Sequence, residues 1–154
     1  MKATTILVLC AAIAAPLFAS EPTTALLIID IQDFYFPGGN VPLVEPEAAA
    51  ANAARVLAAF RAEGKPIVHV RHDVEPGGAI HASVAPKGGE KVFTKSEISC
   101  FNGTQVLAYL KKIGVERLVI VGMQTHMCLE AATGQPTTSV SSAWSSATPA
   151  QPET

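Results

Sequence analysis

Three side chains able to take part in nucleophilic chemistry follow short apolar segments or begin a predicted helix. Asp30 follows the apolar run 25–29, Lys95 follows a short apolar step, and Cys128 falls in the first turn of a predicted helix. A carboxylate beside a thiol can accept its proton, and a cation facing both would favour the thiolate. Each residue also has a structural explanation, since Asp30 could cap a turn, Lys95 could be solvated, and Cys128 could be small buried packing.

The position of Cys128 at a helix start adds to the chemical interpretation. Unpaired backbone N–H groups and the helix dipole stabilise a thiolate there. The same N–H groups could hold the oxyanion formed when a carbonyl is attacked.

Strand and helix patterns alternate along the chain, which predicts an α/β fold. Short buried strands are expected at 25–29, 67–70 and 118–121, and helices from Pro46 to a glycine C-cap at Gly64 and over 106–113. The first strand–helix–strand unit implies parallel strands. We therefore expect a doubly wound, Rossmann-like parallel sheet in three α/β/α layers, with residues 74–91 as a loop over the active face and a helix start directly after Lys95.

Polar residues follow three of these segments. Asp30 ends the first strand, residues 69–73 end the second, and the loop before Cys128 follows the third. Ligands of an open parallel sheet bind beyond the carboxyl ends of its strands. The sequence therefore places all three features at one edge.

Three strings together resemble the isochorismatase-like cysteine hydrolases, which include nicotinamidases, carbamoyl-sarcosine amidases, ureidoacrylate hydrolases and isochorismatases. They are ALLIIDIQDFYFPGG, EKVFTKSEISCFNGTQVLAYLKKIGVERLVIVG and GMQTHMCLEA, in the family's order and spacing. The resemblance runs from about Ala25 to Thr133. It implies a catalytic triad of Asp30, Lys95 and Cys128.

The resemblance also implies a cis peptide near Met123 and Gln124, a strained loop that aims N–H groups at the oxyanion. The implied reaction is attack of Cys128 on a small amide, loss of ammonia or an amine, and hydrolysis of the thioester. Vinyl-ether hydrolysis is an alternative reaction, against which the presence of Cys128 argues. A catalytically inactive fragment, acting as a binding or oligomer-forming module, is an alternative of another class.

Candidate substrate-binding residues flank this predicted site, although the aromatic ones could equally belong to the core. These candidates are Phe34, Phe36, Phe101, Thr125 and His126. Cys100 is expected to be inert packing. The histidine cluster that binds metal in nicotinamidases is not reproduced after the second strand, so neither a metal nor another cofactor is expected.

Composition limits the partners of the chain. The 154 residues carry a net charge of −2 and no basic run that could neutralise nucleic-acid phosphates. Residues 1–19 have the pattern of a signal peptide, with a basic start, an apolar segment and a cleavage site before Ser20. We expect a secreted or periplasmic protein with a small-molecule amide substrate and no membrane contact after cleavage, although an uncleaved anchor or a buried first helix are alternatives. A homo-oligomer remains open.

The composition changes abruptly after Thr133. Residues 134–154 are rich in Ser, Thr, Pro and Ala, without helix or strand periodicity. This is typical of a disordered extension. However, degenerate codons for this segment allow a shifted frame that reads RAAHDVGFECVVVGDA, which resembles the family's continuation. We therefore expect a partial hydrolase domain over 24–133, incomplete at its C-terminus, and an out-of-frame tail.

Overall fold

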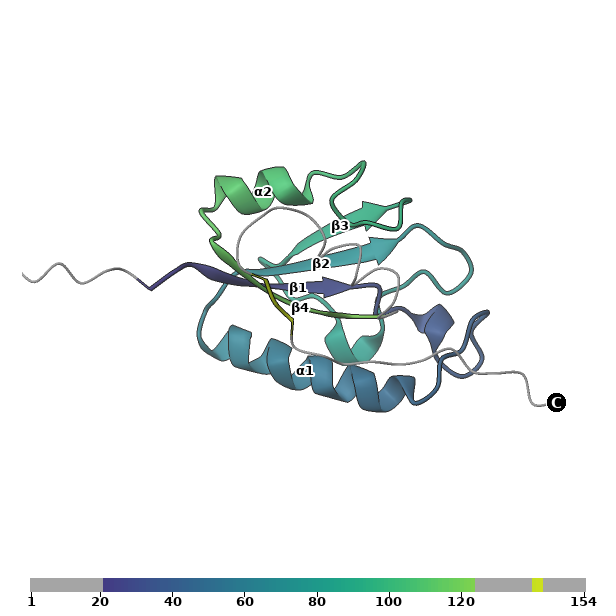
Figure 1. Ribbon diagram of the computed structural model, residues 1–154. Coiled ribbons are helices and arrows are strands. Elements are labelled where there is room, and N and C mark those ends of the chain that lie inside the picture. Colours follow the sequence, from purple (N-terminus) through teal and green to yellow (C-terminus); the bar gives the residue numbers. More distant parts are fainter. Residues whose placement is uncertain (1–20, 124–139, 143–154) are drawn as a thin grey trace, which may run out of the picture.

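The computed structural model of the chain describes residues 21–123 and 140–142. Its centre is a parallel sheet with the strand order β3-β2-β1-β4-β5 (Figure 1). The strands are β1 (Thr24–Ile29), β2 (Ile67–His72), β3 (Lys91–Lys95), β4 (Arg117–Gly122) and β5 (Val140–Ser142).

The central strand β1 is buried on both faces. Leu26 and Ile28 pack in one apolar cluster, whereas Leu27 and Ile29 pack in the other. This alternation follows from the two-residue repeat of a strand, and a strand covered on both faces has a continuous apolar sequence. The apolar residues 25–29, from which this strand was predicted, therefore form the centre of the core.

Helices cover both faces and complete three layers. Helix α1 (Pro46–Ala62) lies on one face and α2 (Val106–Lys112) on the other (Figure 1). Proline occupies the first position of α1, and Gly64 follows its end with a φ of +63° that suits glycine. Two short 3₁₀ helices, η1 (Asp33–Tyr35) and η2 (Ala82–Val84), lie in the loops after β1 and β2.

The expected doubly wound α/β fold, its parallel strands and its two helices are confirmed. Two local expectations are wrong or incomplete. The segment leading to Lys95 is a full edge strand, β3, rather than an apolar step, and no helix begins directly after Lys95, because residues 96–105 form bends and turns before α2 starts. Within the tail, the structure adds β5, for which the sequence had given no periodic signal.

The order in which strands are added to the sheet reverses between β1 and β4. From β1 the chain builds outward through β2 to β3 and then crosses to β4 on the other side of β1. In such a fold the ligand site lies beyond the carboxyl ends of the two strands that flank this switch point. Asp30 follows one of these strands and Met123 follows the other.

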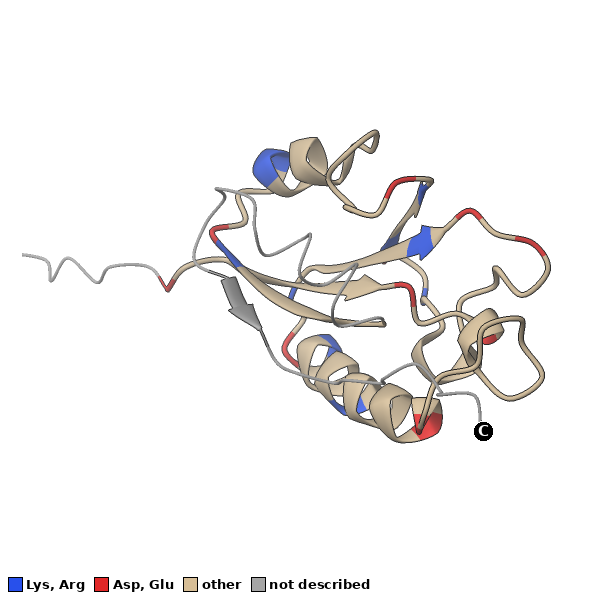
Figure 2. Cartoon of the chain, turned by 45° about the vertical axis from the view of Figure 1, so that its right-hand side comes forward, with Lys and Arg blue, Asp and Glu red and all other residues tan. Residues whose placement is uncertain are grey.

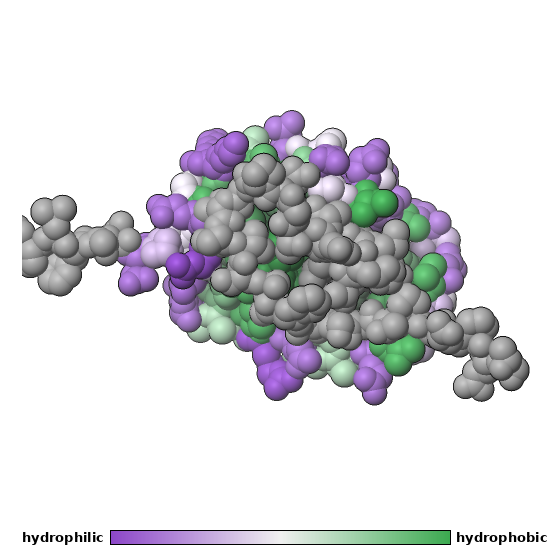
Figure 3. Space-filling view, viewed as in Figure 1, coloured by the Kyte–Doolittle hydropathy of each residue, from purple (hydrophilic) through white to green (hydrophobic). Residues whose placement is uncertain are grey.

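Charged and hydrophobic residues both occur on the visible surface of the described part. Acidic and basic residues are distributed over several elements (Figure 2), and hydrophobic residues appear on the visible face as separate spots among hydrophilic ones (Figure 3). Among the described residues, no helix is both long and apolar enough to cross a membrane.

Candidate active site

Asp30 leaves the strand conformation as soon as β1 ends. Strand alternation would direct its side chain to the α1 face, the face of Leu26 and Ile28. Its φ of +54° is left-handed, which interrupts the alternation, and aspartate is one of the few residues that tolerate this conformation. The carboxylate is 1% exposed. A buried carboxylate on strained backbone requires a compensating partner.

That partner is Lys95, the last residue of β3. Its Nζ lies 2.8 Å from Asp30 Oδ2, and its side chain is fully buried. The same ammonium donates to the main-chain oxygens of Glu97 and Ile98, each at 3.1 Å. Lys95 is therefore not the solvated lysine considered as an alternative. The bends that replace the expected helix after Lys95 direct these two carbonyls at the ammonium.

The pair connects strands that are not neighbours in the sheet. Strand β2 lies between β1 and β3, so about 10 Å separates the strands that carry Asp30 and Lys95. Lys95 therefore crosses the end of β2, where its register partner is His72. The His72 Nδ1 atom lies 3.4 Å from Lys95 Nζ.

Gln32 holds the end of β2 in place, although no motif in the sequence points to it. It is fully buried two residues after Asp30. Its Nε2 donates to the oxygens of His72 at 3.0 Å and Gly78 at 2.7 Å, while its Oε1 accepts from the His72 N–H at 2.7 Å. The available signal was a polar residue next to a strand end in an otherwise apolar context.

The predicted aromatic pocket residues lie mainly in the core. Phe34 and Phe36 are 7% and 6% exposed and belong to the α1-face cluster, and Phe36 stacks on His81 at 3.6 Å between ring centroids. Phe101 packs partly buried against the other cluster. These positions agree with the core alternative, and a role in substrate binding stays a prediction.

The end of β4 lies against the end of β1. Gly122 is the register partner of Ile29, and a Cβ atom at Gly122 would come 2.2 Å from the Ile29 oxygen. Met123 is buried, and its N–H donates to the same oxygen at 3.0 Å. Glycine thus allows the loop after β4 to start beside Asp30. The other predicted residues of that loop, Gln124, Thr125, His126 and Cys128, lie outside the described residues, as does the predicted cis peptide.

A second charged cluster lies on the α1 face, where Glu90 precedes β3. Its carboxylate accepts from Arg61 at 2.6 and 2.9 Å, from buried His69 Nε2 at 2.9 Å and from the Lys87 N–H at 2.8 Å. Hydrogen bonding to Arg61, above all, lowers the pKa of Glu90 to about 2. Burial lowers the pKa of His69, which favours the neutral ring. This cluster joins α1, β2 and the start of β3.

The described histidines do not converge. His69 binds Glu90, His72 faces Lys95, and His81 stacks on Phe36. Over residues 21–123 and 140–142, no three His, Cys, Asp or Glu side chains are grouped so that they could hold a metal ion.

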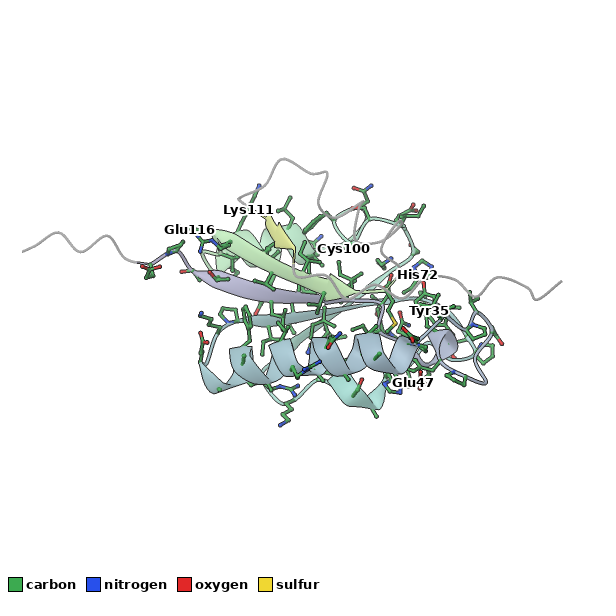
Figure 4. The ribbon with its side chains drawn as sticks, turned by 60° about the horizontal axis from the view of Figure 1, so that its bottom comes forward. Tyr35, Glu47, His72, Cys100, Lys111 and Glu116 are labelled. Atoms are coloured by element: carbon green, nitrogen blue, oxygen red, sulfur yellow. The ribbon has the colours of Figure 1, made fainter. Side chains whose placement is uncertain are left out.

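The ends of the sheet are visible in the view with side chains. Tyr35 and His72 lie at the carboxyl end of the strands, whereas Lys111 and Glu116 lie at the other (Figure 4). His72, the register partner of Lys95, thus lies at the carboxyl edge, where Asp30 also follows β1, as predicted for Asp30 and the end of the second strand.

Known proteins are similar to this chain in sequence and fold. The model of the isochorismatase domain matches residues 24–135. The isochorismatase family protein YddQ of Bacillus subtilis is 43% identical over 120 residues, which cover 71% of this chain and 67% of YddQ. Maleamate amidohydrolase of Pseudomonas putida is 31% identical over 140 residues, covering 74% of this chain and 64% of that enzyme. The chain thus spans about two thirds of the length of these relatives.

Solved structures agree with the sequence comparison. An isochorismatase hydrolase from Oleispira antarctica superposes with a TM-score of 0.75 at 40% identity, covering 85% of this chain and 79% of that one.

Proposed function

The chain belongs to the isochorismatase family, and from that premise we propose that it hydrolyses a small amide-type C–N bond through a thioester on Cys128. The observation that carries the proposal is the buried Asp30–Lys95 ion pair at the carboxyl edge of the sheet. Burying two charges costs several kcal/mol each, and sites of catalysis are where such costs are commonly met.

Chain geometry supports Cys128 as the nucleophile. Cys128 follows Met123 by five residues, and Met123 is hydrogen-bonded beside Asp30. Five residues span at most about 18 Å, so the length of the chain between Met123 and Cys128 leaves Asp30 within reach of the thiol. Maleamate amidohydrolase is an amide-cleaving relative, which supports an amide as substrate class.

The proposed reaction proceeds in two halves. Asp30 accepts the Cys128 proton, the thiolate attacks the amide carbon, and a C–S bond forms while the C–N electrons move to nitrogen. The departing amine takes the proton from Asp30. Water then gives a proton to Asp30 and attacks the thioester, the C–S bond breaks, and the proton returns to sulfur. Lys95 balances the carboxylate and favours the thiolate throughout.

The test is ammonia release from a panel of small primary amides by the purified chain. We expect Cys128→Ser to abolish release and Cys100→Ala to retain it, because Cys100 is buried packing on the α2 face. Circular dichroism establishes that both variants are folded. Equal release by the wild type and Cys128→Ser would contradict the thioester, and a folded wild type without release would favour an inactive fragment.

A further inference from the structure

We propose that His72, held in place by Gln32, is a positioning residue for Lys95. The inference rests on the proposed function, because it concerns the cation that serves Cys128. The structural observation is a closed ring of contacts that runs from Asp30 through Lys95 and His72 to Gln32 and returns along the chain to Asp30.

The first step is the direction of the hydrogen bond. An ammonium has three donors and no acceptor, so His72 Nδ1 is the accepting atom in its contact with Lys95 Nζ. Because the same ammonium also reaches Asp30 Oδ2 and the oxygens of Glu97 and Ile98 at shorter distances, the 3.4 Å contact to His72 shares one of these donors. The ring proton of His72 is therefore on Nε2. An imidazole in this tautomer offers a lone pair to the ammonium without adding charge.

The second step is the route of the lysine side chain. Lys95 has to cross the end of β2 to reach Asp30, and His72 is its register partner on the strand that it crosses. Register partners project from the same face of a sheet. The imidazole therefore flanks the side chain that reaches across and limits where the ammonium can lie.

The third step is the rigidity of His72 itself. Its backbone N–H and C=O are both bound by the side chain of Gln32, at 2.7 and 3.0 Å. Gln32 is fully buried and also binds the Gly78 oxygen, which fixes the loop after β2. The end of a strand, where ladder bonds cease, is thus held by a side chain from the segment that carries Asp30.

This arrangement predicts an effect on the chemical step rather than on substrate binding. A displaced ammonium would favour the Cys128 thiolate less, while the surfaces that bind substrate remain. Small displacements of catalytic groups commonly cost tenfold or more in rate.

The test compares three variants of the full chain. His72→Phe keeps a ring of similar size without the acceptor, His72→Asn places Oδ1 near the position of Nδ1, and His72→Leu serves as a second apolar variant. We expect His72→Phe and His72→Leu to lower kcat for the amide about tenfold with KM little changed, and His72→Asn to stay within about threefold of the wild type.

A second readout does not require substrate. The rate of alkylation by iodoacetamide at pH 7, followed for the Cys128 peptide by mass spectrometry, reports the thiolate directly. We expect it to fall in parallel with kcat in His72→Phe and to be retained in His72→Asn, while the peptide of buried Cys100 serves as an internal reference.

The outcomes separate the two proposals. If Cys128→Ser abolishes turnover but all three His72 variants retain kcat and alkylation rate, the positioning role is wrong and the proposed function stands. Equal losses in the Asn and Phe variants would also overturn it, because they would indicate shape rather than hydrogen bonding. Full turnover by Cys128→Ser would overturn the proposed function itself.

Discussion

At the scale of single residues, the proposed chemistry depends on two charges that are removed from water together. Asp30 and Lys95 are 1% and 0% exposed in their side chains, and each compensates the burial of the other. Removing one leaves the other buried without its counter-charge, which costs about 3–5 kcal/mol, whereas replacing both can be nearly neutral.

The first prediction is therefore a double-mutant cycle. We expect Asp30→Asn and Lys95→Met each to lower the free energy of unfolding by about 3 kcal/mol and the double variant to recover much of that loss. Asparagine tolerates the left-handed φ of +54°, so Asp30→Asn isolates the charge from the backbone. Urea unfolding measures all three. Additive losses would show that the two charges are not coupled.

The double variant should recover stability without recovering catalytic activity. All three variants are expected to lose the amidase activity by a factor of about 10² or more, since the general base or its counter-charge is absent. A stable double variant with wild-type turnover would contradict the assigned roles.

Residue type and position made Asp30 and Lys95 candidates, each with a structural alternative, and only the family resemblance paired them. Asp30 follows a buried strand, as expected. The sequence could not reveal the role of Gln32 or the contact between His72 and Lys95, because these depend on pairing between segments 40 and 23 residues apart in the chain. Phe34 and Phe36 show another limit of the sequence. An aromatic residue near a strand end is equally consistent with a substrate pocket and with the hydrophobic core.

At the scale of elements, the position of Lys95 depends on the edge strand β3. This strand has a neighbour only on its β2 side among the described strands, and Glu90 joins its start to α1 and β2. The Glu90 carboxylate accepts hydrogen bonds from Arg61, His69 and the Lys87 N–H, and these bonds hold the start of β3.

The second prediction concerns the pH dependence of this attachment. The folded pKa of Glu90, about 2, lies below its ordinary value of 4.5, so its stabilisation is fully present above pH 4.5 and is lost as pH falls toward 2. We expect Glu90→Gln to lower the free energy of unfolding by about 2 kcal/mol at pH 7, with the difference from wild type shrinking below pH 4.5.

The matched control is Glu63→Gln, which removes an exposed ion pair with Lys65 and should change stability by less than about 0.5 kcal/mol. Urea titrations between pH 2.5 and 7 measure both variants. A Glu90→Gln deficit that stayed constant down to pH 2.5 would count against the assigned ionisation.

The third prediction concerns the contact between β4 and β1. Gly122→Ala would place a methyl group 2.2 Å from the Ile29 oxygen, so the strand ends must separate next to Asp30. We expect a lower Tm and a lower kcat. Gly88→Ala is the control, because its Cβ meets no atom within 4 Å and its φ is ordinary. Equal Tm values for the two variants would show that the close approach is not needed.

Strands and helices were predictable where their periodicity was strong. β1, β2, β4 and α1 were expected within two residues of their observed ends, because buried apolar runs and a Pro–Gly pair of caps specify them locally. β3 was missed as a strand because an edge strand carries mixed residues, Lys91 to Lys95, whose pairing comes from β2 rather than from their own pattern.

At the scale of the whole molecule, the order of strands brings the proposed chemistry to one edge. The switch between β1 and β4 was predictable in kind from the alternation of strands and helices, whereas the order of the strands came from the structure. The tail showed no periodicity, so β5 beside β4 depends on tertiary pairing that no local pattern reveals.

The fourth prediction concerns export. We propose that residues 1–19 direct the chain out of the cytoplasm and that the mature protein begins at Ser20. Expression in a bacterial host with mass spectrometry of the exported fraction should show this N-terminus. Ala19→Glu removes the small residue before the cleavage site and should leave the precursor uncleaved. An intact Met1 start in the exported wild type would refute cleavage.

The proposed out-of-frame origin of residues 134–154 has a direct test at the level of the gene. Resequencing the DNA from codon 125 to the stop should reveal one inserted or missing base, after which the family-like continuation is read. An unchanged reading frame would refute this origin.

The central claim is a covalent intermediate on Cys128, and acyl-enzyme capture tests it most directly. The chain is mixed with a turned-over amide, quenched in acid within milliseconds, digested and analysed by mass spectrometry. We predict one acyl group per chain on the Cys128 peptide, released by hydroxylamine and absent from Cys128→Ser. Ammonia release with no acyl group on that peptide, and undiminished in Cys128→Ser, would contradict the claim.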